Sequence, residues 1–122
     1  MRETAVVLVG HGSRFPDFDS PLKKIRRTLL KEARFKEVRL AYLEINSPSI
    51  PEAVRRCVEN GAKQVNILPY FVLGGNHVEK HIPKIVADIQ KEHKKNARIF
   101  LCSYLGFHEK IAEVVKERLR CR

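Results

Sequence analysis

The chain has 122 residues, a length that suits one domain, and 43% of them are hydrophobic, enough to bury a core. Its 24 basic and 14 acidic residues give a formal net charge of +10, which favours a polyanionic partner such as a polycarboxylate or a phosphate. No apolar run approaches the roughly 20 residues of a membrane span, and no zinc finger or aromatic-rich RNA motif accompanies the charge. We therefore expect neither a membrane protein nor a nucleic-acid-binding module.

Four predicted strands alternate with four predicted helices along the chain. The strands are expected over residues 4–9, 37–43, 64–68 and 97–102, and the helices over residues 17–33, 49–60, 83–93 and 111–119. The second helix begins with a capping box, Ser49 and Glu52, and has Pro51 in its first turn. Pro83 suits the first turn of the third helix, and we expect Ile82, the residue before it, to lie outside that helix.

Strands that alternate with helices indicate an α/β fold with a parallel sheet. We expect one three-layer domain over residues 1–122, with a four-stranded parallel sheet and helices on both faces. The three cysteines, Cys57, Cys102 and Cys121, have no metal-type spacing, and the first two fall on apolar faces. The N-terminal apolar run is too short for a signal peptide. These features predict a cytoplasmic protein with reduced thiols.

Polar residues follow the ends of three strands, where ligands bind in open parallel sheets. His11 follows the first strand between two glycines, which suggests close approach to a ligand; Glu44 follows the second strand, and His77 follows the third. Two imidazoles and a carboxylate with an open position are typical of catalytic metal sites. Ser13 is expected to cap the next helix or to bind an anion, and Arg14 could clamp an anion.

Three kinds of function fit these residues. The first is metal chemistry at His11, Glu44 and His77. The second is phosphoryl transfer with His11 as the nucleophile, which needs several cationic groups around that histidine. The third is a non-catalytic carrier of a metal or a tetrapyrrole. His81 lies four residues after His77, but the expected break before Pro83 means that the two need not share a helical face.

Three stretches of the chain also resemble a known family. They are Val9-Gly10-His11-Gly12-Ser13-Arg14, then Tyr42-Leu43-Glu44 with Pro48-Ser49-Ile50-Pro51-Glu52-Ala53, and finally Pro69-Tyr70-Phe71-Val72-Leu73-Gly74-Gly75-Asn76-His77-Val78 with Ile82-Pro83. Together they resemble the sirohydrochlorin chelatases of the class II chelatase superfamily, most closely the short, single-domain cobaltochelatase (CbiX) type. One departure is His81, because members of the family often carry an acid before the Ile-Pro or Leu-Pro pair.

The resemblance implies insertion of a divalent metal into sirohydrochlorin without a nucleotide; the expected metal is Co²⁺, with Ni²⁺ or Fe²⁺ as alternatives. It implies a homodimer that works in cobalamin or another tetrapyrrole pathway. His11 and His77 match the family's metal-site histidines and Glu44 its acidic residue, which makes these three the expected metal-binding and catalytic groups. The expected substrate contacts are Ser13, Arg14, Tyr70, Phe71, Gly74, Gly75, Asn76, Lys80, His81 and Lys84.

Overall fold

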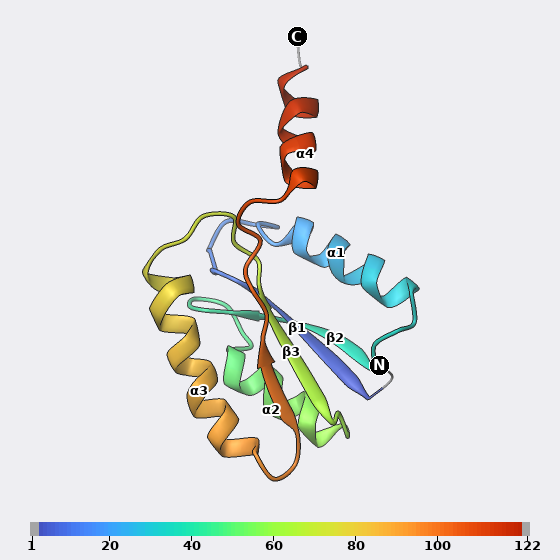
Figure 1. Cartoon of the computed structure of the whole chain (residues 1–122), viewed down its shortest axis with the longest axis vertical. Helices are drawn as coiled ribbons and strands as arrows, with labels where there is room; N and C mark the ends of the chain where they lie inside the picture. Colours follow the sequence, from blue (N-terminus) through green and yellow to red (C-terminus); the bar gives the residue numbers. More distant parts are fainter. Residues whose placement is uncertain (1–2, 121–122) are drawn as a thin grey trace.

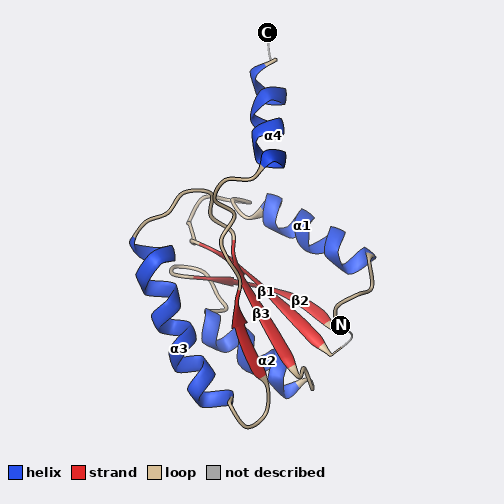
Figure 2. Cartoon of the chain, in the orientation of Figure 1, coloured by secondary structure: helices blue, strands red, loops and turns tan. Residues whose placement is uncertain are grey.

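The computed structural model describes residues 3–120 as an α/β fold built on one four-stranded parallel sheet (Figures 1 and 2). The elements are β1 (Thr4–Gly10), α1 (Ser20–Lys31), β2 (Glu37–Tyr42), α2 (Ile50–Glu59), β3 (Gln64–Pro69), a π turn (His77–His81), α3 (Ile82–His93), β4 (Arg98–Leu101) and α4 (Glu109–Leu119). The strand order is β2-β1-β3-β4, and every pair is parallel. The expected fold class is confirmed.

The sheet is covered on both faces, and β1 is therefore buried along nearly its whole length. Alternate residues of a strand point to opposite faces. Val6 and Leu8 pack with Leu22 of α1, whereas Val7 and Val9 join the larger core against α2 and α3. Figure 1 shows α1 on one side of the sheet and α2 and α3 on the other. Each fully buried side chain of this kind contributes roughly 1.5–3 kcal/mol.

The start of α2 follows the sequence prediction. The Ser49 hydroxyl accepts a hydrogen bond from the Glu52 amide at 3.3 Å, and the Glu52 carboxylate accepts one from the Ser49 amide at 2.9 Å. This reciprocal pair is the expected capping box. Cys57 is buried and Cys102 is half-buried, and both are free thiols. Cys121, the third cysteine, lies outside the described residues.

Two predicted helix starts are wrong. α1 begins at Ser20 rather than near Asp17, because Asp17 has a φ of 57°, a left-handed backbone that a helix cannot include. Ile82 opens α3 with helical angles instead of lying outside it. Its side chain is fully buried with Val78 and Val86, so core packing overrides the local bias of the residue before a proline.

The π turn joins the third loop to α3 without a break. The Ile82 amide donates to the His77 carbonyl, five residues back, which is the hydrogen bond that defines a π turn. The turn widens the backbone just ahead of Pro83, whose ring would otherwise press on the Glu79 carbonyl. His77 and His81 consequently share one face, a question that the expected break before Pro83 had left open.

α4 differs from the other helices because it extends away from the sheet (Figure 1). None of its residues is buried, and Val114, Val115 and Leu119 are 50%, 52% and 75% exposed. Within residues 3–120, no helix has both the length and the apolar character needed to cross a membrane.

Candidate active site

The loops that follow β1, β2 and β3 meet at the carboxyl edge of the sheet, as predicted. Hydrogen bonds extend the sheet pairing past the strand ends: the Leu43 amide donates to the Gly10 carbonyl at 3.1 Å, and the Glu44 amide to the His11 carbonyl at 3.1 Å. The Tyr70 amide donates to the Val9 carbonyl at 2.8 Å on the other side of β1. The backbone at His11 is thereby fixed against both neighbouring loops.

Four side chains from these loops lie next to one another. The rings of His11 and His77 meet edge to face with their centroids 5.0 Å apart. The Glu44 carboxylate lies 4.0 Å from His11 Nδ1, and these two side chains are about half exposed. On the other side, His77 Nδ1 and His81 Nδ1 are 3.2 Å apart. The structure thus brings together His11, Glu44 and His77, and adds His81 to them.

These side chains form a row of neighbouring pairs, Glu44–His11–His77–His81. Among residues 3–120, no group of three histidine, cysteine, aspartate or glutamate side chains is already gathered in positions to hold one metal ion. A three-ligand metal site at His11, Glu44 and His77 therefore stays a prediction. The carbonyl of Gly12 lies 3.3 Å from His11 Nδ1, which gives this ring nitrogen a polar neighbour besides Glu44.

Gly12 brings the first two loops of the site together. Its φ is +111°, and a Cβ atom at this position would lie 1.9 Å from the Glu44 carbonyl oxygen. The glycine thus permits close approach of the Glu44 backbone, whereas its place beside His11 in the sequence suggested close approach to a ligand. The neighbouring amide of Ser13 donates to the Asn46 side chain at 2.8 Å, which adds a second link between the two loops.

Ser13 and Arg14 lie in the long loop between β1 and α1. The Ser13 hydroxyl accepts a hydrogen bond from the Phe15 amide at 3.0 Å, so it caps a turn inside the loop. The predicted capping of the next helix is wrong, because Asp19 occupies the N-cap position of α1. Arg14 is exposed and, with Ser13 and Lys23, lines an open hollow of about 450 Å³. Two cationic side chains, Arg14 and Lys23, therefore border this hollow together with the acidic Asp17 and Asp19.

Tyr70 and Phe71 combine packing with exposure to the site. Each is half-buried, Tyr70 against the α1 side of the core and Phe71 against the other side. Both also line a hollow of about 210 Å³ beside His11. Among the other predicted substrate contacts, Gly74, Gly75, Asn76, Lys80 and Lys84 are exposed on the third loop, the π turn and the start of α3.

A part-buried hydrogen bond of Asp19, which lines the hollow beside His11, was not predicted from the sequence. The Tyr42 hydroxyl donates to the Asp19 carboxylate at 2.6 Å, and both residues border the loop after β1. This hydrogen bond lowers the pKa of Asp19, while burial and the Asp19 carboxylate raise the pKa of Tyr42. Asp19 comes eight residues after His11 in the chain, and its partner ends β2, so only the fold reveals the pair.

A second missed contact supports the third loop. The Tyr104 hydroxyl, from the segment after β4, donates to the Glu79 carboxylate at 2.8 Å, and this raises the pKa of Tyr104. Gly74 lies against the pair, since a Cβ there would be 2.9 Å from the Tyr104 oxygen and 3.0 Å from the Glu79 oxygen. One sequence feature could have indicated this contact: Tyr104 follows the fourth strand, and residues after strand ends gather at the same edge of the sheet.

Several known proteins resemble this chain over most of its length. The CbiX family model matches residues 5–121. A sirohydrochlorin cobaltochelatase of Priestia megaterium is 38% identical over 95% of this chain, and one of Sulfurisphaera tokodaii is 32% identical over 93%. The chain spans 37% of the length of the first relative and 89% of the second. A cobaltochelatase of Methanocaldococcus jannaschii is 36% identical over 74% of this chain, and the chain spans 63% of its length.

Solved structures show the same fold. A CbiX protein from Marinobacter aquaeolei VT8 matches with a TM-score of 0.76 and 26% identity, over 95% of this chain and 97% of that one. The sirohydrochlorin chelatase SirB from Bacillus subtilis subspecies spizizenii, in complex with cobalt, matches with a TM-score of 0.86 and 23% identity. That match covers 98% of this chain but 50% of SirB. On the family model and the identity to these relatives, the chain belongs to the CbiX family.

Proposed function

We propose that this chain is a sirohydrochlorin chelatase that inserts Co²⁺ into sirohydrochlorin and releases two protons, without a nucleotide, in cobalamin or related tetrapyrrole biosynthesis. The observation that carries the proposal is the meeting of His11, Glu44 and His77 from three separate strand ends. The names of the relatives, mostly cobaltochelatases with some ferrochelatases, support the reaction class and keep Fe²⁺ open as an alternative metal. Ni²⁺ is a further alternative, since imidazole ligands suit it too.

In the proposed reaction the metal is a substrate. His11 and His77 hold it loosely, because neutral imidazoles bind first-row metals and can exchange them. Each pyrrole nitrogen that binds the metal must lose its proton, and an imidazole ring or the Glu44 carboxylate accepts it near neutral pH. The His11 and Glu44 side chains are about half exposed at an open edge of the sheet, so a flat macrocycle could lie against them.

Positive side chains around the site suit a substrate with carboxylates on its periphery. Arg14, Lys80 and Lys84 are exposed near the loops that carry His11 and His77. Arginine pairs with carboxylates through two parallel hydrogen bonds, and lysine acts as a point charge. The formal charge of +10 would also draw a polyanion towards the chain. In this proposal Ser13, Asn76 and the backbone at Gly74 and Gly75 contact the substrate, with Tyr70 and Phe71 beside the ring.

Phosphoryl transfer by His11 is less well supported. The Glu44 carboxylate lies 4.0 Å from His11 Nδ1. A carboxylate next to the nucleophile would repel a phosphate, whereas it would favour a metal cation.

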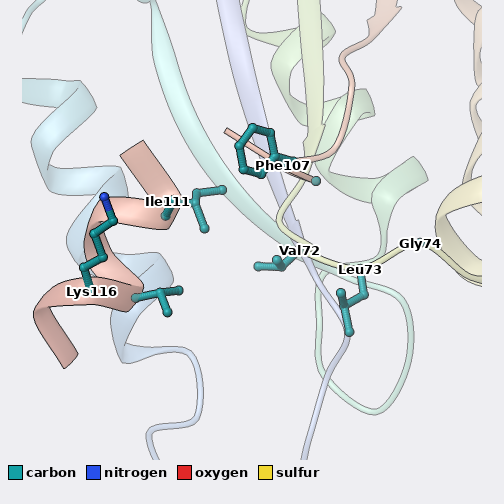
Figure 3. Close-up of a pocket in the computed structure, with 9 residues that line it drawn as sticks. Val72, Leu73, Gly74, Phe107, Ile111 and Lys116 are labelled. Atoms are coloured by element: carbon teal, nitrogen blue, oxygen red, sulfur yellow. The ribbon is translucent and has the colours of Figure 1, made fainter. Parts of the chain in front are cut away.

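We also propose that the chain works as a homodimer of single chelatase-like domains in the cytoplasm. An apolar hollow of about 590 Å³ separates the third loop from α4, with Val72 and Leu73 on one side and Ile111 and Val115 on the other. Figure 3 shows Val72 extending from its loop towards α4, with Phe107 above it. A second copy could place its own α4 in this hollow, and the two contacts would be related by symmetry. The doubled length of SirB is consistent with two such domains acting together.

The experiment that tests the function mixes the purified chain with sirohydrochlorin and Co²⁺, Ni²⁺ or Fe²⁺ under anaerobic conditions and follows the absorption change. Insertion should be faster than in the protein-free control, and fastest with Co²⁺. Tight binding of the tetrapyrrole without acceleration would replace the proposal with a carrier. Hydrolysis of a phosphate ester that depends on His11, without any effect on the tetrapyrrole, would replace it with phosphoryl transfer.

A further inference from the structure

The π turn brings two imidazole nitrogens within hydrogen-bond distance of each other. His77 Nδ1 and His81 Nδ1 are 3.2 Å apart, with ring centroids 5.5 Å apart and the ring planes at 39°. His81 is exposed and His77 is half-buried, so the pair is open to solvent on the His81 side. Because α3 continues directly from the π turn and Ile82 is fully buried, the backbone that carries both histidines is anchored in the core.

The separation of these nitrogens is that of two ligands on one metal ion. Imidazole nitrogens bind first-row divalent metals at about 2.0–2.1 Å. Two such nitrogens at an angle of about 90–109° around one ion are therefore roughly 2.9–3.4 Å apart. The 3.2 Å between the two Nδ1 atoms falls inside this range. When no ion is bound, a single ring proton can lie between them, with one nitrogen donating and the other accepting.

The neighbouring acid is already engaged elsewhere. Glu79 lies on the same π turn, but its carboxylate accepts the hydrogen bond of Tyr104 at 2.8 Å. Glu44 lies on the far side of His77, next to His11. The two imidazoles therefore act as a pair rather than as part of a closed set of three or four ligands. A pair leaves the remaining positions on an ion to water, and such an ion is easily handed on.

We propose that His77 and His81 form a two-nitrogen chelate that captures the divalent metal ion from solvent, so that His81 is a metal ligand. This rests on the proposed function, since it identifies how the metal substrate is received. His77 neighbours both His81 and His11, so the captured ion is one side chain away from His11, and Glu44 lies beyond His11. His81 was expected from the sequence to contact the tetrapyrrole, and the present assignment gives it a metal-binding role instead.

The test measures metal binding alone, with Co²⁺ and Ni²⁺ added to the metal-free chain and followed by calorimetry and by the visible absorption of bound Co²⁺. His81→Ala should weaken binding by about tenfold or more, because even loss of a group that only supports a ligand costs 10–100-fold in affinity. His77→Ala should weaken it at least as much. Circular dichroism and thermal melting of each variant confirm that it is folded.

Two control variants make the result specific. His108→Asn removes an exposed imidazole elsewhere and keeps a side-chain acceptor for the Lys110 amide, which His108 Nδ1 now accepts. Glu79→Gln removes the acid of the same π turn. Both should leave the affinity for Co²⁺ within about twofold of the unmodified chain. If Glu79→Gln weakened binding as much as His81→Ala does, the acid would take part in the site together with the imidazoles, and the two-nitrogen chelate would be wrong.

The remaining outcomes separate this proposal from the proposed function. If folded His81→Ala binds Co²⁺ as tightly as the unmodified chain, the chelate is refuted, even where sirohydrochlorin insertion is accelerated. If His81→Ala loses the affinity but the unmodified chain fails to accelerate insertion, the chelate stands and the chelatase activity does not.

Discussion

Gly12 ties the His11 loop to the Glu44 loop, because a Cβ at this position would lie 1.9 Å from the Glu44 carbonyl oxygen. We expect Gly12→Ala to lower the free energy of unfolding by about 3 kcal/mol, which combines the cost of a positive φ with that of the clash. Chemical denaturation measures this change.

Gly61→Ala is the matched control for Gly12→Ala. Gly61 also has a positive φ, +96°, but the nearest atom to a Cβ there is 3.7 Å away. This variant should cost about 1 kcal/mol, the backbone component alone. If the free energy of unfolding fell equally in the two variants, the close approach of Gly12 to the Glu44 backbone would make no contribution to stability.

Cys57 is expected to make the chain less stable at alkaline pH. Burial, with a smaller contribution from Glu37, raises the pKa of its thiol to about 12. The pKa of an unfolded thiol is about 8.5, so above this pH the unfolded chain releases a proton that the folded chain keeps. The stabilisation is complete below the unfolded pKa and is lost as the pH rises from there through the folded pKa.

The predicted slope can be measured by urea denaturation between about pH 9 and 11. With rising pH, the free energy of unfolding should fall more steeply for the unmodified chain than for Cys57→Ala, by up to about 1.4 kcal/mol per pH unit. Cys57→Ala is less stable at neutral pH because it leaves a cavity, so the slopes rather than the absolute values are compared. Identical slopes would mean that the thiol titrates normally in the folded chain.

Among the elements, the regular ones could be predicted and the irregular ones could not. The strands and helices were recognisable because each has one period of apolar residues and a clear boundary, such as the Ser49 capping box. The π turn escaped prediction because the bias of a residue before a proline is local, whereas burial of Ile82 is set by the core. The start of α1 was misplaced because the positive φ of Asp17 has no sequence signature.

α4 has no buried residue, and its apolar side chains Val114, Val115 and Leu119 are exposed. We expect the chain to be a dimer by light scattering and Val115→Glu to weaken the dimer at least about tenfold, because it buries a charge in the interface. Val115 lines the apolar hollow opposite Val72, and Val114, similarly exposed at 50%, does not. Val114→Glu should therefore leave the dimer intact. A monomeric unmodified chain, or equal effects of the two variants, would contradict the proposed interface.

At the scale of the whole molecule, the parallel topology explains why the main site could be predicted. All four strands run in the same direction, so the residues after each strand end must meet at one edge. His11, Glu44 and His77 meet for that reason. The contacts of Glu79 with Tyr104 and of Asp19 with Tyr42 depend on the exact paths of loops, which periodicity does not encode.

The most direct test of the account is the initial rate of Co²⁺ insertion into sirohydrochlorin by His11→Ala and His77→Ala, beside the unmodified chain and His108→Asn. We predict that each of the first two variants loses at least about 100-fold in rate, the usual contribution of a positioned proton acceptor, while His108→Asn keeps the full rate. If folded His11→Ala and His77→Ala both inserted Co²⁺ at the rate of the unmodified chain, these two imidazoles would not be the catalytic groups.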